Sequence, residues 1–240
     1  MIAGRRRVGR IANMSTSHIT NLSEHELRRI HAETGVDVYA LLDLLERTPA
    51  ERLRIAMANA RNMARLRAVT RPYDADEMIA SGAFDALAIL GVLHRREIQF
   101  VVIGGIAGYL LGSELLSANL DICFAADPEN ARQLARTLND VHARLVGFPH
   151  DVPEIVDEHV LRRGDVFTFQ TEYGVLRCLS NPAGTEGYDD LRDHAEGMEI
   201  DGLKTYVAGL ADLIRMKEAS SREKDRLVLV TLRAMQKLRE

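Results

Sequence analysis

Apolar and polar positions in the first third of the chain recur with the spacing of amphipathic helices. Ser23 precedes Glu26 at the spacing of a capping box, which is typical of a helix start. Thr48 is followed by Pro49, and proline fits the first position of a helix because it has no backbone N–H to leave unpaired. The pattern therefore predicts that residues 22–68 are largely helical. The expected helices begin after Ser23, cover Val36 to Leu45, and run from Pro49 to about Val69.

Beyond residue 84 the pattern alternates between short apolar runs, which predict strands, and helical segments. Strands are expected at Gln99–Ile103, Asn119–Phe124, Val156–Leu161, Val166–Thr171 and Val175–Leu179, with a hairpin over Ile200–Val207. Helices are expected at Phe84–His94, from Gly104 through Leu111, from Asp127 to about Leu145, and at Tyr188–Ala195, Ala208–Glu218 and Arg222–Arg239. This order predicts an α/β (α+β) fold, a mixed sheet with flanking helices that is preceded by a helical N-terminal region.

The length of 240 residues allows one or two domains. The most suitable boundary is the stretch Thr70–Asp76, because its proline disfavours a helix at the residue before it. The first residues contain arginines but not the apolar stretch of a secretory signal, so we expect a disordered leader. The predicted organisation is a basic leader at 1–13, a helical region at 14–72, and an α/β domain at 73–240.

The two halves of this organisation differ in charge. Residues 1–72 carry 13 arginines and 7 acidic residues, a net charge of +6, whereas residues 73–240 carry 18 lysines and arginines and 28 acidic residues, a net charge of −10. A basic region beside an acidic one suggests contact with nucleic acid, docking of the two parts, or homo-oligomers formed through the N-terminal helices. Because the arginines are interleaved with acidic residues, a solvated arginine-rich helix is an equally good interpretation.

Composition excludes several classes of protein. With 46% hydrophobic and 28% charged residues, the chain has the balance of a globular protein rather than a disordered one. The longest apolar run, Ile98–Gly112, is shorter than the roughly 20 residues of a membrane-spanning helix, so we expect no membrane span. Cys123 and Cys178 both lie in apolar runs and are too few for a disulfide framework. We expect two buried free thiols in a cytoplasmic protein.

The most informative segment joins a buried strand to a helix through two glycines. Gly104 and Gly105 follow the apolar run that ends at Ile103, and glycine lets a phosphate approach the backbone closely. The next strand carries Asn119 and Asp121, which point to the same face because strand side chains alternate. A glycine pair with one aspartate is weak evidence alone, since such glycines more often form a plain tight turn.

In this order and spacing the chain resembles the nucleotidyltransferase superfamily, in particular its minimal, AbiEii-like and bacterial toxin-like members. The resemblance covers roughly residues 84–240 and includes Gly104-Gly105-Ile-Ala, Ser117-Ala-Asn-Leu-Asp121, the strand that contains Arg177, and the tail from Leu210 to Lys217. It implies that a nucleoside triphosphate binds with Mg²⁺ held by three carboxylates. It also implies transfer of a nucleotide to RNA, protein or a small acceptor, and a partner antitoxin or toxin.

The departures from that family pattern affect the metal site. Asn119 stands where the resemblance implies the first aspartate, and Arg177 stands where it implies the third carboxylate, so that only Asp121 remains. A guanidinium repels a metal ion and keeps its proton, so we expect Mg²⁺ binding and nucleotide transfer to be weakened or lost. Arg177 could instead neutralise a phosphate directly. The alternative is a shifted register in which another carboxylate supplies the oxygen: Asp165, Glu172 or Glu114.

The resulting candidate site combines a catalytic pair with a set of nucleotide-binding residues. Asp121 and Asn119 are the candidate catalytic residues, and Asp121 is the candidate metal ligand. The candidate nucleotide-binding residues are Gly104, Gly105, Ser117, Arg177 and Lys217. For Lys217 the alternative is a solvated charge near a helix end.

Three hypotheses follow for the function. In the first, the chain keeps the fold but has lost transfer, and its surface binds nucleotide, RNA or a protein. In the second, it is an active Mg²⁺-dependent nucleotidyltransferase toxin that modifies RNA or protein. In the third, the N-terminal helices form an antitoxin-like or oligomerising arm on a non-catalytic binding protein.

Overall fold

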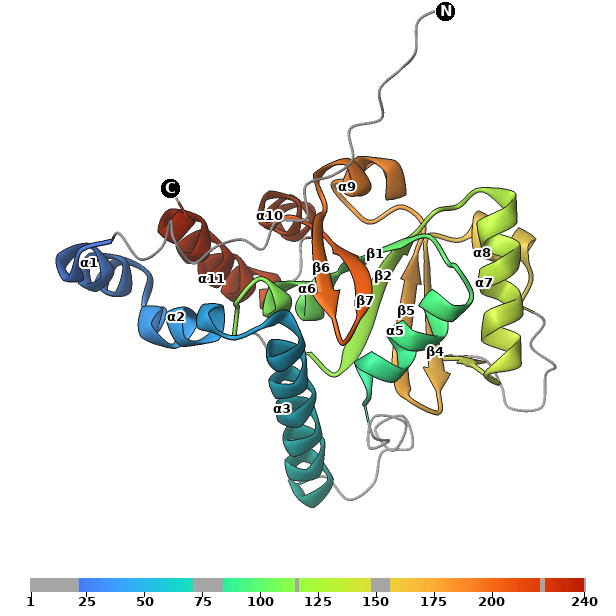
Figure 1. The fold of residues 1–240 in the computed structure, drawn as a ribbon, viewed down its shortest axis with the longest axis horizontal. Coiled ribbons are helices and arrows are strands. Elements are labelled where there is room, and N and C mark those ends of the chain that lie inside the picture. Colours follow the sequence, from blue (N-terminus) through green and yellow to red (C-terminus); the bar gives the residue numbers. More distant parts are fainter. Residues whose placement is uncertain (1–21, 71–83, 115–116, 148–155, 221–222, 240) are drawn as a thin grey trace, which may run out of the picture.

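The computed structural model describes residues 22–70, 84–114, 117–147, 156–220 and 223–239, and its centre is a mixed seven-stranded sheet. The strand order is β3-β4-β5-β2-β1-β7-β6. Helices flank the sheet, with α1, α2 and α11 at one side of the molecule and α7 and α8 at the other (Figure 1). The fold is therefore the expected mixed α/β arrangement with flanking helices.

The sequence pattern places most of the elements correctly. The strands are β1 (Phe100–Ile103), β2 (Asn119–Phe124), β3 (Arg144–Leu145), β4 (Val166–Thr171), β5 (Gly174–Leu179), β6 (Glu196–Ile200) and β7 (Leu203–Val207). The helices are α1 (Glu24–Thr34), α2 (Val38–Glu46), α3 (Pro49–Thr70), α5 (Ala86–Arg95), α6 (Gly104–Leu110), α7 (Pro128–Asp140), α8 (Glu158–Arg163), α9 (Tyr188–His194), α10 (Leu210–Ala219) and α11 (Glu223–Arg239).

The N-terminal helices start where the capping residues predict. The Ser23 hydroxyl accepts from the Glu26 backbone N–H, and the Glu26 carboxylate accepts from the Ser23 N–H, which completes a capping box. Thr48 and Glu51 form the same reciprocal pair at the start of α3. These helices then pack on the rest of the chain, α1 against α11 and α3 against α6 and β6.

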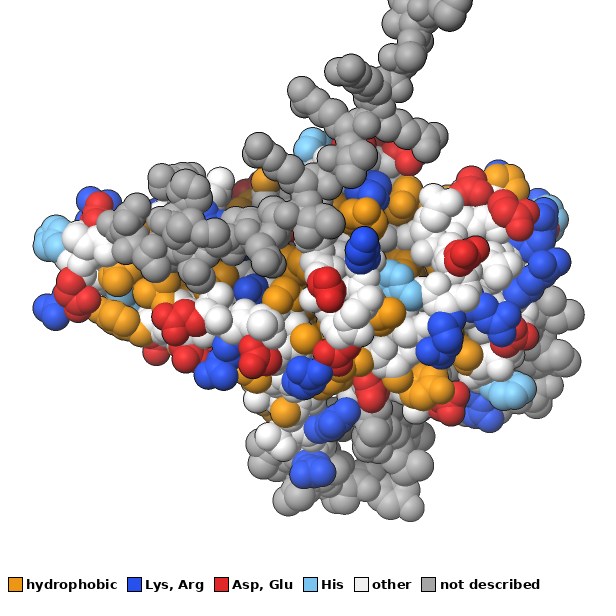
Figure 2. All heavy atoms as spheres, in the orientation of Figure 1, with side chains coloured by type: hydrophobic (Ala, Val, Ile, Leu, Met, Phe, Trp, Pro, Cys, Tyr) orange, Lys and Arg blue, Asp and Glu red, His pale blue; other side chains and the backbone are white. Residues whose placement is uncertain are grey.

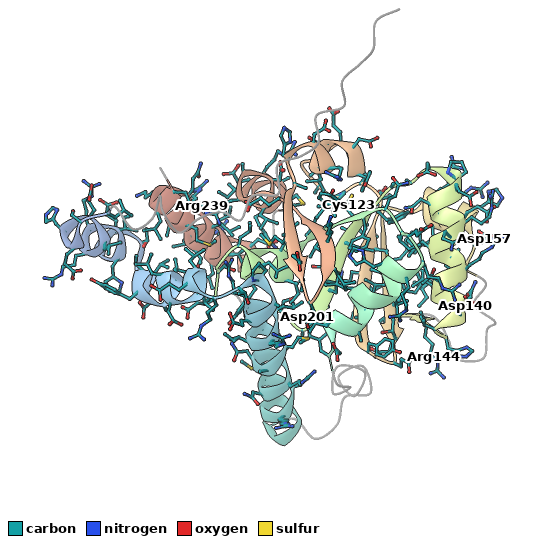
Figure 3. The ribbon with its side chains drawn as sticks, in the orientation of Figure 1. Cys123, Asp140, Arg144, Asp157, Asp201 and Arg239 are labelled. Carbon is teal, nitrogen blue, oxygen red and sulfur yellow. The ribbon has the colours of Figure 1, made fainter. Side chains whose placement is uncertain are left out.

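Two predicted elements are wrong. The helix expected to reach Leu145 ends at Asp140, because His142 has a left-handed φ of 49° and the chain turns into β3 at Arg144, beside β4 (Figure 3). The strand expected over Val156–Leu161 is instead helix α8. The Asp157 carboxylate caps that helix by accepting from a backbone N–H one turn later, so a local hydrogen bond overrides the β-branched character of the run.

One buried apolar cluster extends from the N-terminal helices through the sheet to α11. Leu41 and Leu53 from α2 and α3 are fully buried in it, together with Leu120 of the central strand β2. The predicted leader at 1–13 and the boundary at Thr70–Asp76 lie wholly or largely outside the described residues, so the division into 14–72 and 73–240 stays a prediction. Among the described helices, none has the length and apolar character needed to cross a bilayer.

Candidate functional site

Gly104 forms the floor of the candidate site, directly under the Asp121 carboxylate. Strands β1 and β2 are antiparallel, and their register places Ile103 opposite Asp121. Gly104 has a left-handed φ of 69°, and a Cβ built on it would lie 2.9 Å from the Asp121 Cγ atom. Any side chain at this position would be strained by its φ and would displace the carboxylate. The first glycine is thus required both by the turn and by Asp121.

Gly105 has a parallel role beneath Ser117. A Cβ at Gly105 would lie 2.6 Å from the Ser117 Cβ and 2.9 Å from its hydroxyl oxygen. That hydroxyl donates to the Asn119 carbonyl at 2.9 Å, which fixes the segment that enters β2. Because neither glycine has a side chain, Ser117 and Asp121 can both lie against the start of α6.

The Asp121 carboxylate is held by an amide and a guanidinium. The Asn119 side-chain amide donates to Oδ1 of Asp121, and the Arg177 guanidinium lies 3.4 Å from the same oxygen. The parallel pairing of β2 and β5 sets this contact, because Asp121 is in register with Arg177. The side chains of Asp121 and Arg177 are 12% and 27% exposed, so the pair is only partly shielded from solvent. The structure thus brings together Gly104, Gly105, Ser117, Asn119, Asp121 and Arg177.

This donor set does not fit a magnesium ion. Mg²⁺ takes carboxylate oxygens and water in octahedral geometry, and it rarely loses its waters for neutral ligands. Here the Asn119 amide offers its N–H₂ group, rather than its oxygen, to the one carboxylate, and the Arg177 guanidinium brings a positive charge close to it. Within the described residues there is no group of three or more His, Cys, Asp or Glu side chains that could hold a metal ion.

The other carboxylates considered from the sequence have different surroundings. The pKa of the Glu114 carboxyl is raised by burial and by Asp37 and Asp43, so Glu114 faces the acidic residues of α2. Glu172 forms a hydrogen bond with Tyr173 in the turn between β4 and β5. Asp165 is exposed just before β4. A shifted register with one of these at the Asp121 site therefore finds no support among the described residues.

Lys217 engages a different carboxylate. Its ammonium lies 2.7 Å from Oδ1 of Asp225, a residue of α11 that is only 2% exposed. The Ser220 hydroxyl donates to the other oxygen of Asp225 at 2.5 Å. These contacts join the end of α10 to the start of α11, so Lys217 has a structural partner, and its nucleotide-binding role stays a prediction.

The register of the sheet adds one residue that the motif search missed. Thr168 of β4 lies opposite Arg177 of β5, and residues opposite one another in antiparallel strands share a face of the sheet. Thr168 therefore belongs to the same face of the sheet as Arg177 and Asp121. The sequence alone did not point to Thr168, because β4 contains no motif and its pairing with β5 is known only from the structure.

Two arginines at the far end of α6 were also missed. Arg52 of α3 donates to the Leu110 carbonyl, and Arg239 of α11 donates to the Leu111 carbonyl at 2.9 Å. Cations at the C-terminal end of a helix stabilise its last carbonyl groups. Burial lowers the pKa of Arg52, and the nearby Arg239 lowers it further. Helices from both ends of the chain thus position the helix that begins with Gly104.

No protein-family model matches the chain. A search of curated proteins finds no relative. Among solved structures the chain is similar to the lincosamide antibiotic adenylyltransferase LnuA in its lincomycin-bound form, with 15% identity, 62% of this chain and 94% of that chain covered, and a TM-score of 0.42.

It is also similar to a protein of Thermotoga maritima described as a proposed nucleotidyltransferase, with 16% identity, 64% of this chain and 87% of that chain covered, and a TM-score of 0.38. A third similar structure is the antibiotic-resistance factor ANT(2'')-Ia, with 13% identity, 63% and 85% covered, and a TM-score of 0.38. Identities and scores this low do not assign the chain to a family, so the site stands on the chemistry of its own residues.

Proposed function

We propose that this chain is a nucleotide-binding protein with a nucleotidyltransferase-type site in which an arginine has replaced the metal. Its Arg177 guanidinium takes the charge-neutralising role that Mg²⁺ has in an active site of this type, and nucleotide transfer is weak or absent. In a toxin–antitoxin pair, which the resemblance suggests, such a protein would act by binding rather than by transfer.

One observation carries this proposal: the Asp121 carboxylate is in contact with a cation and an amide donor of the chain itself. The Arg177 guanidinium lies 3.4 Å from Asp121 Oδ1, longer than a well-formed charge-assisted hydrogen bond. The guanidinium is therefore held near the glycine pair without being fully engaged, and its planar group of five N–H donors matches a phosphate.

The same residues define what each group would do with a bound nucleotide. Arg177 would bind a phosphate through parallel N–H donors, while the glycine pair leaves the backbone beside it open to close approach. Asp121 would accept hydrogen bonds from hydroxyl groups of the nucleotide. Because the charges of Asp121 and Arg177 cancel, we expect the affinity to be modest rather than high.

The proposal is tested by nucleotide titrations in a chelator, measured by calorimetry for each of the common nucleoside triphosphates. Arg177→Gln should weaken binding about tenfold or more, since a charge-assisted phosphate contact contributes roughly 1.5–3 kcal/mol. The matched control is Arg132→Gln, which removes a partly exposed, ion-paired arginine from α7. No binding by the parent chain, or an equal loss in both variants, would refute the proposal.

A second variant tests the assignment of the metal positions. Asn119→Asp combined with Arg177→Asp would put three carboxylates beside Gly104, the donor set that Mg²⁺ prefers. We expect this double variant to gain Mg²⁺ affinity, measured as a Mg²⁺-dependent rise in melting temperature, because a ligand that binds the folded state stabilises it. Absence of any such rise would count against the positions assigned to these residues.

A further inference from the structure

From Arg52 to its end, helix α3 contains arginines but no acidic residue. Between Glu51 and Asp74 the chain has six arginines and not one aspartate or glutamate. Five of the six lie in α3: Arg52, Arg54, Arg61, Arg65 and Arg67. This run differs from α1, where exposed arginines are paired with glutamates one turn away.

Three of these arginines share one face of the helix. Arg54, Arg61 and Arg65 are separated by seven and four residues, which are spacings that return to nearly the same side of an α-helix. All three are exposed. In Figure 1 the second half of α3 projects away from the sheet, and in Figure 2 Lys and Arg side chains follow that half.

The face is not neutralised along its length. Arg54 is paired with Asp201 in the β6–β7 turn at 2.5 Å. Arg61 donates its Nε–H to the Phe84 carbonyl at 3.3 Å, which leaves the two terminal nitrogens of its guanidinium. Neither Arg61 nor Arg65 forms an ion pair with any residue in the part of the chain that the structure describes. Two guanidinium groups one helical turn apart are therefore available.

The face adjoins the end of the sheet where the candidate site lies. Arg61 contacts Phe84 through the hydrogen bond described above. Phe84 packs on Gly174, where an added Cβ would lie 3.1 Å from the Phe84 Cα. The next residue along β5, Val175, is in register with Asn119. A chain of direct contacts thus leads from Arg61 to the strand ends that carry Asn119 and Asp121.

The chemistry of this face favours a nucleic acid over a protein partner. Protein interfaces have an apolar centre with aromatic side chains, whereas nucleic-acid interfaces are polar and positively charged. Among the side chains that the structure describes, the large apolar ones that are exposed lie outside α3: Tyr39, Val146, Val160, Val166, Leu227 and Val230. The α3 face offers arginine and small or polar side chains instead.

We propose that the Arg61–Arg65 face of α3 binds the phosphate backbone of a nucleic acid. Arginine suits this role because its guanidinium binds phosphate in a bidentate manner and never loses its charge. The contacts are to phosphates, so binding follows charge density rather than base sequence. The proposal does not depend on nucleotide binding at Arg177.

The test uses the full chain with a fluorescently labelled single-stranded RNA, a labelled DNA duplex of equal length and a labelled polyglutamate, measured by anisotropy over a range of salt concentrations. Arg61→Gln with Arg65→Gln should weaken RNA or DNA binding roughly 10- to 30-fold at about 0.1 M salt and reduce the slope of log K against log[salt] by about 1.4 to 1.8. Comparing RNA with DNA identifies the preferred nucleic acid.

The matched control is Arg162→Gln with Arg163→Gln on α8. This pair is also exposed, removes the same charge, and includes an arginine whose Nε–H donates to a backbone carbonyl, that of Ala126 at 3.2 Å. The control should keep at least half of the parent affinity. The proposal is overturned if the two double variants lose binding equally, if the parent chain binds neither nucleic acid, or if polyglutamate binds as tightly. Loss of nucleotide binding in Arg177→Gln with nucleic-acid binding intact keeps the two sites distinct.

Discussion

Two aspartates with cationic partners, Asp225 and Asp121, differ in how tightly they are held. Asp225 is 2.7 Å from the Lys217 ammonium and also accepts a hydrogen bond from Ser220, with a side chain only 3% exposed. Asp121 is 3.4 Å from the Arg177 guanidinium, lies over a glycine, and is 12% exposed. The first pair joins two helices. The second lies at the ends of strands beside a backbone that admits no side chain, which is the setting expected of a binding site.

The largest expected effect comes from breaking the tight pair. Lys217→Met leaves the Asp225 carboxylate, whose side chain is only 3% exposed, without its cationic partner, and an uncompensated buried charge costs about 3–5 kcal/mol of unfolding free energy. Urea denaturation followed by circular dichroism measures it. As a control, Glu218→Gln breaks an exposed pair with Arg233 and should change stability by less than about 1 kcal/mol. If both variants lose less than about 1 kcal/mol of unfolding free energy, the Lys217–Asp225 pair is held no more tightly than an exposed pair.

The close approach of Gly104 to Asp121 can be tested by comparing Gly104 with Gly35, a glycine with the same backbone φ. Gly104 and Gly35 both have a φ of 69°, but a Cβ at Gly35 has nothing within 4 Å. Alanine should cost about 1–2 kcal/mol at either position because of the left-handed backbone. Gly104→Ala should cost more than Gly35→Ala and should also displace the Asp121 carboxylate and weaken nucleotide binding. Equal stability and equal nucleotide affinity in the two variants would contradict the close approach.

A partly buried histidine, His94, sharpens the comparison through pH. Burial lowers the pKa of His94, whose Nε2 lies 3.1 Å from the Thr205 hydroxyl. The unfolded chain then binds the proton more tightly than the folded one, so this contribution is full above the ordinary pKa of 6.5 and is lost as the pH falls. His94→Gln should reduce the loss of stability between about pH 8 and pH 5, and an equal loss in the parent chain and in this variant would contradict the lowered pKa of His94. Urea titrations at both pH values measure the difference.

The smallest effect concerns the two thiols on strands β2 and β5. Burial, with a small contribution from Asp190, raises the pKa of Cys123 to about 12, and burial also raises the pKa of Cys178. Neither thiol is therefore ionised near neutral pH, and iodoacetamide should react with both only after unfolding. Mass spectrometry of timed alkylation checks this. Rapid labelling of Cys123 alone in the native state would show that the strand carrying Asp121 opens far more readily than the core.

Local patterns predicted how the strand and the turn that carry the candidate residues are built, while the role of these residues stays a prediction. Alternation along β2 placed Asn119 and Asp121 on one face, and the glycine pair marked the strand-to-helix turn. Both cysteines are free and buried, as expected. In each case the determining interactions lie within a few residues of one another.

Contacts between distant residues were not predictable in the same way. The arginine contacts at the end of α6 join residues 58 and 128 positions apart, and neither arginine belongs to a motif. Residues 156–161 were mistaken for a strand because Val156 and Val160 outweighed a single capping aspartate, Asp157. The end of α7 was misplaced because the pairing of Arg144 and Leu145 depends on strand β4, which begins only at Val166.

The most direct test of an arginine in place of the metal is the nucleotide affinity of the parent chain and of Asp121→Asn, each measured with Mg²⁺ and with a chelator. If Arg177 alone neutralises the phosphates, removal of Mg²⁺ leaves the affinity of the parent chain unchanged. Asp121→Asn then binds at least as tightly, because asparagine keeps a side-chain oxygen that accepts from the nucleotide hydroxyls while the negative charge near the phosphates is gone. Binding that requires Mg²⁺ and disappears in Asp121→Asn would contradict the account and establish a metal site at Asp121.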